Sequence, residues 1–169
     1  MLNNKVLLTS FQTWLPHQKS NASDDLLEMF QQEFVGNAAL FWLRKLPVNT
    51  PQASILTINK IEDIRPQVVI CCGMAESRSQ LTIESRASCG EKLLSTAVDL
   101  EGLITKLVHT EISHEAGKFV CEGLYYNVLH HLKRRQFNSS AIFVHVPLLN
   151  EENASQIKED FRLILQSFL

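Results

Sequence analysis

Gln67-Val-Val-Ile-Cys-Cys-Gly73 decides the fold, because it is a continuously apolar run of the length of one strand. Such a run is typical of a strand that is buried on both faces at the centre of a sheet. To either side of it, short β-branched runs alternate with segments whose apolar residues fall at helical spacing. This alternation predicts an α/β fold with a largely parallel or mixed sheet that helices cover on both faces.

The remaining elements are expected in chain order around this central strand. Ser23 is expected to cap the first helix, which has apolar residues at helical spacing up to Phe34. Thr50 and Pro51 have the residue types of an N-cap and a first helical position, and that second helix should end before Pro66. Further strands are expected at 5–11, 39–46, 80–87, 110–113 and 141–146, and further helices at 99–108, 119–135 and 152–168.

Length and composition predict one ordinary globular domain over residues 1–169. The chain is 45% hydrophobic and 20% charged, with a formal net charge of −2. Its longest basic run, Lys133-Arg134-Arg135, fits a helix C-terminus, where cations complement the helix dipole. We therefore expect no nucleic-acid partner.

No segment predicts contact with a membrane or export from the cell. No stretch approaches the roughly 20 apolar residues that a membrane span needs, and residues 1–8 show no leader pattern. The four cysteines lack C-x-x-C spacing, which favours free thiols in a reducing compartment. The chain is expected to be soluble and cytoplasmic; its cysteines are Cys71, Cys72, Cys89 and Cys121.

Cys121 is the candidate nucleophile. It falls in the first turn of the helix expected at 119–135, where unpaired N–H groups and the helix dipole lower a thiol pKa from about 8.5. Ala116 and Gly117, just before the helix, permit the tight turn that an approaching substrate needs. The alternative is a buried cysteine that packs as a small apolar side chain.

His145 and Glu84 are the candidate base and its orienting carboxylate. His145 ends an apolar strand, and sites in open α/β sheets assemble at the C-terminal strand ends. Glu84 lies near the end of an otherwise apolar strand, where an unpaired charge is costly, so it needs a partner such as an imidazolium. The alternatives are a structural histidine bonded to a carbonyl group, and an ion pair of Glu84 with Arg86 or Arg78. Together, a thiol, an imidazole and a carboxylate form a nucleophile, base and orienter set.

The chain resembles the pyroglutamyl peptidase family over most of its length. Two motifs are the most specific: Glu115-Ala-Gly-Lys-Phe-Val-Cys121, continuing into Tyr125-Tyr126, and Phe143-Val-His-Val-Pro147. Five further segments are also similar to the family: Val6-Leu-Leu-Thr-Ser-Phe-Gln-Thr-Trp14, Ser20-Asn-Ala-Ser23, Leu46-Pro-Val48, Val69-Ile-Cys-Cys-Gly73 and Leu81-Thr-Ile-Glu84. The resemblance implies a three-layer α/β/α sandwich with a central mixed, largely parallel sheet.

The resemblance also implies an activity and its residues. Cys121 would be the nucleophile, His145 the base and then the acid, and Glu84 the third member of the triad. The implied enzyme is a cofactor-free cysteine exopeptidase that cuts the amide after an N-terminal pyroglutamate, so its partner is a peptide with a blocked N-terminus. The implied substrate-binding residues are Phe11, Trp14, Phe119, Val120 and Met74, where many relatives have Gln in place of Met74.

Two further points follow from the resemblance. Backbone N–H groups at the start of the Cys121 helix, together with the Glu76-Ser77-Arg78 turn, are candidates for the oxyanion site, and Arg78 can instead tether that turn to a carboxylate. Relatives have a long loop after Glu84, whereas residues 87–97 are expected to be almost a direct connection here. Prokaryotic relatives are often homo-oligomers, so a homo-oligomer is possible.

Two alternatives to this function stay open. A related thiol amidohydrolase would act on another small acyl amide, and a non-catalytic family member would act as a binding protein. A metal site is not expected, because His130 and His131 face different sides of a helix, and His109 and His114 have no partner at ligand spacing.

Overall fold

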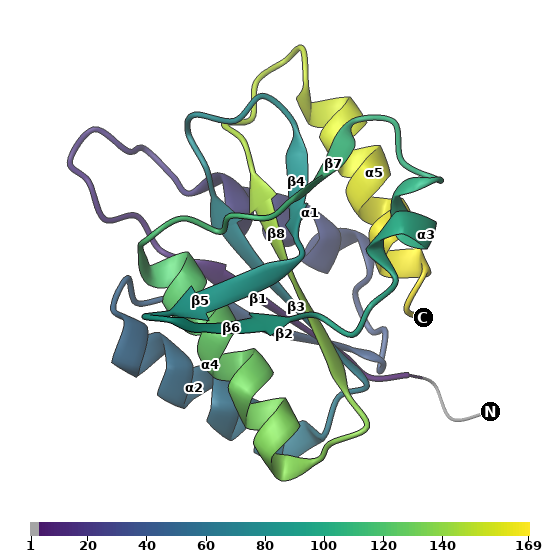
Figure 1. Ribbon diagram of the computed structural model, residues 1–169. Helices are drawn as coiled ribbons and strands as arrows, with labels where there is room; N and C mark the ends of the chain where they lie inside the picture. The colour runs from purple at the N-terminus through teal and green to yellow at the C-terminus, as the bar shows by residue number, and fades with distance from the viewer. Residues whose placement is uncertain (1–3) are drawn as a thin grey trace.

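The computed structural model describes residues 4–169. Part of the N-terminal segment expected to lack a leader, residues 1–3, lies outside the described residues. Six strands form one sheet in the order β2-β1-β3-β8-β4-β7 (Figure 1). Their bounds are β1 Val6–Phe11, β2 Leu40–Leu46, β3 Val68–Met74, β4 Leu81–Glu84, β7 Thr110–Ser113 and β8 Ser140–Val146.

The sheet is mixed and largely parallel, as predicted. Strands β2, β1, β3 and β8 pair in parallel, whereas β4 pairs antiparallel with β8 and parallel with the edge strand β7. The central strand β3 is buried along its whole length. The C-terminal ends of β1, β3 and β8 therefore share one edge of the sheet, which is where α/β folds place their sites.

Helices cover both faces and complete three layers (Figure 1). Alternate residues of β1 and β3 enter two separate cores, as the two-residue period of a strand requires. One core contains residues of α1 (Ala22–Glu33), α3 (Leu100–Ile104) and α5 (Ala154–Gln166). The other contains residues of α2 (Thr50–Ile64) and α4 (Val120–Arg135).

The helix ends refine the sequence predictions. Asn21, not Ser23, is the N-cap of α1, and its side chain accepts a hydrogen bond from the Ser23 backbone N–H at 3.0 Å. Asn49, not Thr50, is the N-cap of α2. These two predicted caps are wrong because Asn is at least as good an N-cap as Ser or Thr, and an Asn precedes both residues closely. Helix α2 ends at Ile64, before Pro66 as predicted.

A hairpin occupies the segment that was expected to be almost a direct connection. Strand β4 ends at Glu84, so the strand expected at 80–87 is wrong beyond that residue, and β5 (Arg86–Cys89) pairs antiparallel with β6 (Lys92–Ser95). Gly90 is the first residue of the two-residue turn and takes φ 59°. A hairpin turn of type II′ has a positive φ at this position, which favours glycine. The carboxylate of Glu122 in α4 accepts hydrogen bonds from the Ser88 N–H and hydroxyl, so the hairpin is fastened to α4.

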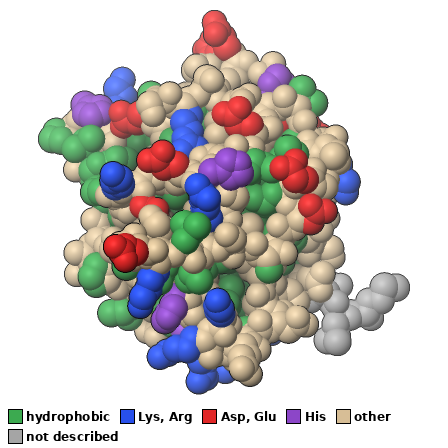
Figure 2. All heavy atoms as spheres, in the orientation of Figure 1, with side chains coloured by type: hydrophobic (Ala, Val, Ile, Leu, Met, Phe, Trp, Pro, Cys, Tyr) green, Lys and Arg blue, Asp and Glu red, His purple; other side chains and the backbone are tan. Residues whose placement is uncertain are grey.

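Positive charge gathers at one end of the face in Figure 2, over the C-terminal end of α4. Lys133, Arg134 and Arg135 occupy the last turn of that helix, as predicted. Between residues 4 and 169, no helix combines the length and the apolar character that a membrane crossing demands.

Candidate active site

Cys121 occupies the first turn of α4, as the sequence predicts. The N-cap is Phe119, whose side chain makes no capping hydrogen bond, so the first amides of the helix are left without a side-chain partner. In the loop before α4, Ala116 is buried, and Gly117 takes φ 93°, a conformation that favours glycine. The thiol therefore lies at a helix start that is open to an incoming acyl group.

The thiol rests in its protonated form. Burial raises the pKa of Cys121 to about 12; Cys71 and Glu84 act in the same direction, and the charge of Arg78 opposes them. The backbone hydrogen bond at the helix start lowers this pKa, as predicted, but burial outweighs it and the net shift is upward. Dipole effects at a helix terminus are modest, and here the loss of hydration outweighs them.

His145 lies on β8 at the same end of the sheet. Its neighbours across the sheet are Gly73 of β3 and Thr82 of β4. The ring is buried, and Nδ1 is 2.7 Å from Oε1 of Glu84. An ionised carboxylate can only accept, so Nδ1 donates and Nε2 keeps its lone pair. The sheet thus holds the imidazole in the tautomer that a general base requires.

Glu84 is fully buried and contacts two of the three partners that the sequence considered, His145 and Arg78. Its Oε1 accepts from His145 and, at 2.7 Å, from Nη1 of Arg78, while its Oε2 has no hydrogen-bond partner within residues 4–169. Burial raises the pKa of Glu84, but hydrogen bonds from His145 and Ser113, followed by the charges of His145 and Arg78, outweigh it, so the net shift is downward. Glu84 is thus ionised. The other proposed partner, Arg86, donates instead to the His114 carbonyl oxygen.

One small cavity, of about 110 Å³, brings the predicted residues together. Cys121 and His145 both line it, with Asn21 as the third polar side chain. Its apolar lining consists of Phe11, Trp14, Val48, Met74, Ala116, Phe119 and Val120. All five predicted substrate-binding residues are therefore present around one space that also contains the candidate nucleophile and base.

The aromatic side chains differ in how firmly they are held. Phe11 is buried and belongs to the core on the α4 side. It therefore both packs in the core and lines the cavity. Phe119 is 56% exposed, and its ring centroid is 5.9 Å from that of Trp14. The Sδ atom of Met74 accepts the Ala22 N–H at 3.3 Å, at the start of α1.

Sequence reasoning missed Asn21, Val48 and Ala116 as lining residues. Asn21 had a usable signal, because an Asn that caps the helix following a strand and its loop lies near the sheet edge where sites form. Its Oδ1 accepts from Ser23, and its Nδ2 donates to the Gln12 carbonyl oxygen. Val48 and Ala116 are apolar residues in loops, and nothing in their local pattern distinguishes them.

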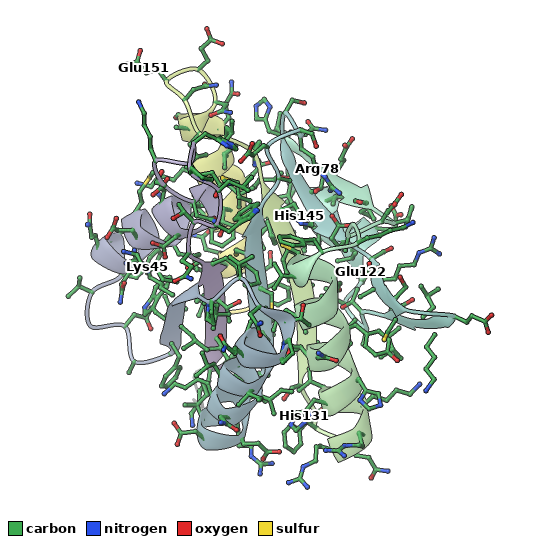
Figure 3. All side chains as sticks on the ribbon, turned by 90° about the vertical axis from the view of Figure 1, so that its left-hand side faces the viewer. Lys45, Arg78, Glu122, His131, His145 and Glu151 are labelled. Atoms are coloured by element: carbon green, nitrogen blue, oxygen red, sulfur yellow. The ribbon has the colours of Figure 1, made fainter. Side chains whose placement is uncertain are left out.

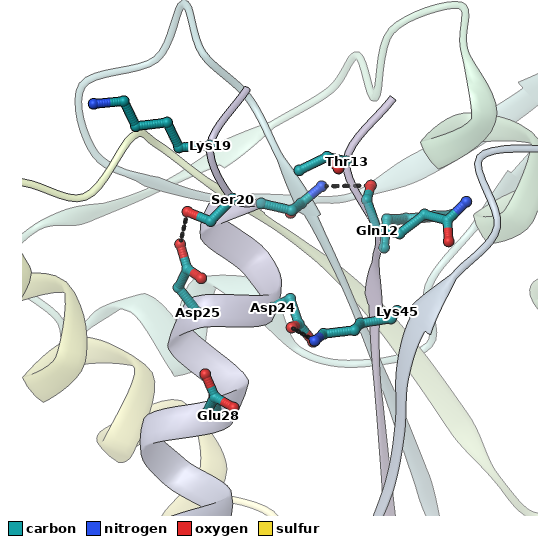
Figure 4. Close-up of a pocket in the computed structure, with 10 residues that line it drawn as sticks. Gln12, Thr13, Lys19, Ser20, Asp24, Asp25, Glu28 and Lys45 are labelled. Carbon is teal, nitrogen blue, oxygen red and sulfur yellow. Dashed lines mark hydrogen bonds and ion pairs between the residues drawn. The ribbon is translucent and has the colours of Figure 1, made fainter. Parts of the chain in front are cut away.

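A second, polar pocket adjoins this cavity and shares Phe11 and Asn21 with it. Figure 4 shows its carboxylates, Asp24, Asp25 and Glu28, along α1, with Asp24 beside Lys45 and Asp25 hydrogen-bonded to Ser20. Asp24 is paired with Arg44 and hydrogen-bonded to Ser10. These carboxylates are therefore tied into the local structure of α1 and β2, away from the thiol.

The candidate base His145 and His131 lie at different ends of the molecule. In Figure 3, Arg78 and His145 lie toward one end of the sheet, and His131 lies at the opposite end of α4. His131 is buried against Glu62, whereas His130 stacks on Tyr126 at the surface, so the two face different sides as predicted. Within residues 4–169, no group of three metal-ligating side chains comes together.

The sequence model of the pyroglutamyl peptidase family matches residues 4–90 and 97–165. The interval between the two matched parts contains β6, whereas β5 lies within the first matched part. Pyrrolidone-carboxylate peptidase of Vibrio campbellii is 27% identical over 177 residues, covering 89% of this chain and 82% of that protein. The corresponding peptidase of Thermococcus litoralis is 27% identical over 169 residues, covering 85% and 76%.

Solved structures agree on the fold. Pyroglutamyl peptidase I from Bacillus amyloliquefaciens superposes with a TM-score of 0.83 at 18% identity, over 99% of this chain and 95% of that chain. Pyrrolidone carboxyl peptidase from Thermococcus litoralis gives a TM-score of 0.84 at 20% identity, over 98% and 93%.

Proposed function

The chain belongs to the pyroglutamyl peptidase family, and from this premise we propose that it hydrolyses the amide bond after an N-terminal pyroglutamate. The catalytic domain would span residues 1–169, and the substrate would be a peptide with a blocked N-terminus. One observation carries the proposal: Cys121 and His145 line the same cavity, and Glu84 holds His145 through a 2.7 Å hydrogen bond.

The reaction proceeds through a thioester. Cys121 Sγ attacks the pyroglutamyl carbonyl carbon while His145 Nε2 takes the thiol proton. The tetrahedral intermediate collapses, the C–N bond breaks, and the imidazolium returns the proton to the departing amine. A water then attacks the thioester, His145 accepts its proton, and pyroglutamate leaves as the thiol re-forms. Because burial raises the pKa of the Cys121 thiol, the reaction needs His145 to take the thiol proton.

The cavity lining supports the choice of substrate. A lactam ring is flat and uncharged, so its faces fit between aromatic side chains such as Phe11, Trp14 and Phe119. Val120 and Met74 complete an apolar wall around the ring. The second N–H of the Asn21 side-chain amide, which the Gln12 carbonyl does not use, would donate to the lactam oxygen.

Backbone N–H groups at the start of α4 would form the oxyanion site, because the helix lacks a side-chain cap there. Both terminal nitrogens of Arg78 are already engaged, by Glu84, Thr82 and the Glu115 carbonyl oxygen. These contacts favour the tethering role for Arg78 over an oxyanion role. The four cysteines are free thiols, which supports function in the reducing cytoplasm.

The test is release of a fluorescent amine from a pyroglutamyl amide under reducing conditions. We expect turnover by the wild type, none by Cys121→Ala, and unchanged turnover by the control Cys89→Ala, which alters an exposed cysteine of the hairpin. No turnover by a folded wild type would contradict the proposal. In that case a panel of other small acyl amides separates a related amidohydrolase from a binding protein.

A further inference from the structure

Arg78 makes an unusual set of contacts at the edge of the site. It lies between β3 and β4, and its Nη1 donates to Oε1 of Glu84 at 2.7 Å and to the hydroxyl of Thr82. Its Nη2 donates to the carbonyl oxygen of Glu115 at 3.0 Å. One guanidinium therefore joins the carboxylate that holds His145 to the loop that precedes the nucleophile.

Glu84 needs a permanent positive charge in this position. Its side chain is 0% exposed, and a buried carboxylate without a cationic partner is strongly disfavoured. His145 supplies an N–H, and it supplies a charge only when its imidazole is protonated. A guanidinium is charged at every working pH and can hydrogen-bond to the carboxylate directly. Arg78, whose side chain is 25% exposed, is the cation within hydrogen-bond distance of Glu84.

The contact with Glu115 reaches the wall of the cavity. Residues 115–119 form the connection into α4, and two of them, Ala116 and Phe119, line the cavity. Apart from Ala116, this connection contributes no residue to the buried core. The hydrogen bond from Arg78 restrains its position together with the Ser113 hydroxyl, which also donates to the Glu115 carbonyl oxygen, and Arg86, which donates to that of His114. A shift of the loop would move the ring-binding wall relative to the thiol of Cys121.

We propose that Arg78 is a positioning residue that holds the ionised Glu84 against His145 and ties the Glu115–Phe119 loop to that carboxylate. The proposal rests on the proposed function for the identity of the reaction, but its first test needs no substrate. Arg78 acts through Glu84 and the loop; it does not contact the reacting atoms.

Two substitutions separate the two parts of this role. Arg78→Lys keeps a charge beside Glu84 but cannot bridge to Glu115, because an ammonium lacks the planar fork of a guanidinium. It should mainly raise KM. Arg78→Gln loses charge and bridge together, so kcat should fall and the acidic limb of the kcat/KM profile should move to higher pH. Arg162→Gln is the matched control, since the Arg162 side chain is 24% exposed, pairs with Glu33 and does not line the cavity.

The first experiment measures alkylation of Cys121 by iodoacetamide across pH in the Cys89→Ala background. Arg78→Gln should slow alkylation on the order of 10- to 100-fold at mildly alkaline pH, the range seen when outer partners of a functional histidine are removed at metal sites. Arg78→Lys and Arg162→Gln should stay within about twofold of the parent. Unfolding curves measured by circular dichroism check that each variant is folded. If Arg78→Gln does not fold, Arg78→Lys can still be compared with the parent.

A double-mutant cycle with Glu84→Gln then tests whether Arg78 acts through the carboxylate. Its effect should shrink strongly in the Glu84→Gln background, because coupled residues are not additive. Equal effects of Arg78→Gln with and without Glu84 would overturn the proposal, as would a profile identical to that of the parent. Alkylation does not depend on turnover, so an inactive wild type would contradict the proposed function without deciding this result.

Discussion

The sulfur of Cys121 packs against the backbone of Gly73. A Cβ atom at residue 73 would stand 2.6 Å from Cys121 Sγ and 2.9 Å from a ring carbon of Phe143. Gly73 is also the sheet neighbour of His145. The missing side chain therefore lets α4 bring the thiol down to the strand pair that carries the imidazole.

Gly73→Ala should consequently impair both stability and activity. Its methyl group has no room between sulfur and ring, and overpacking of this kind costs about 1–3 kcal/mol of unfolding free energy. Thermal unfolding and amine release measure the two effects. In a Cys121→Ala background the stability cost should be smaller, because one of the two clashes is gone. An equal cost in both backgrounds would show that the sulfur does not limit the space.

Glu84→Gln should reduce kcat while leaving the fold largely intact. The amide has nearly the same shape, but it cannot stabilise the imidazolium that forms during attack. The equivalent change in a Ser-His-Asp triad costs about 10⁴-fold in kcat, and we expect a loss of at least about 100-fold here. Steady-state kinetics with a pyroglutamyl amide provide the measurement. Wild-type kcat in this variant would mean that Glu84 serves only to anchor β4.

Alkylation of Cys121 should keep rising with pH through the alkaline range. Because the pKa of the thiol is raised to about 12, the reactive thiolate is a minor form at neutral pH, and its fraction grows about tenfold per pH unit below that value. Mass spectrometry after iodoacetamide treatment measures the rate. Cys71, whose pKa burial also raises to about 12, should not react in the folded protein. A plateau near neutral pH would instead indicate a preformed thiolate–imidazolium pair.

Phe119 and Phe11 should respond differently to truncation. Phe119 is 56% exposed, so Phe119→Ala should raise KM for a pyroglutamyl amide with little change in stability. Phe11 is 1% exposed, and Phe11→Ala should destabilise the protein by about 3–5 kcal/mol, because it leaves a core cavity. Kinetics and chemical denaturation, run on both variants, make the comparison. An unchanged KM in Phe119→Ala would exclude its ring from substrate binding.

Local patterns predicted most of the fold because they depend on neighbouring residues. The apolar run of β3 predicted a strand, and the apolar spacing around Cys121 predicted a helix. The predicted ends of both elements lie within about one residue of the ends in the structure. The hairpin was missed because its strands are four residues each and its turn carries a single glycine signal at Gly90. Strands this short carry too few residues to show a clear alternating pattern beside the longer elements on either side.

The sequence by itself determined the layered α/β fold, the place of Cys121 in the first turn of a helix and of His145 near a strand end. Periodicity and strand composition are local properties, and a chain carries them before it folds. Only the tertiary structure decided that Glu84 meets His145, because antiparallel pairing of β4 with β8 brings together residues 61 positions apart. It also decided the direction of the thiol pKa, since burial arises from packing around Cys121 and not from its place on the helix.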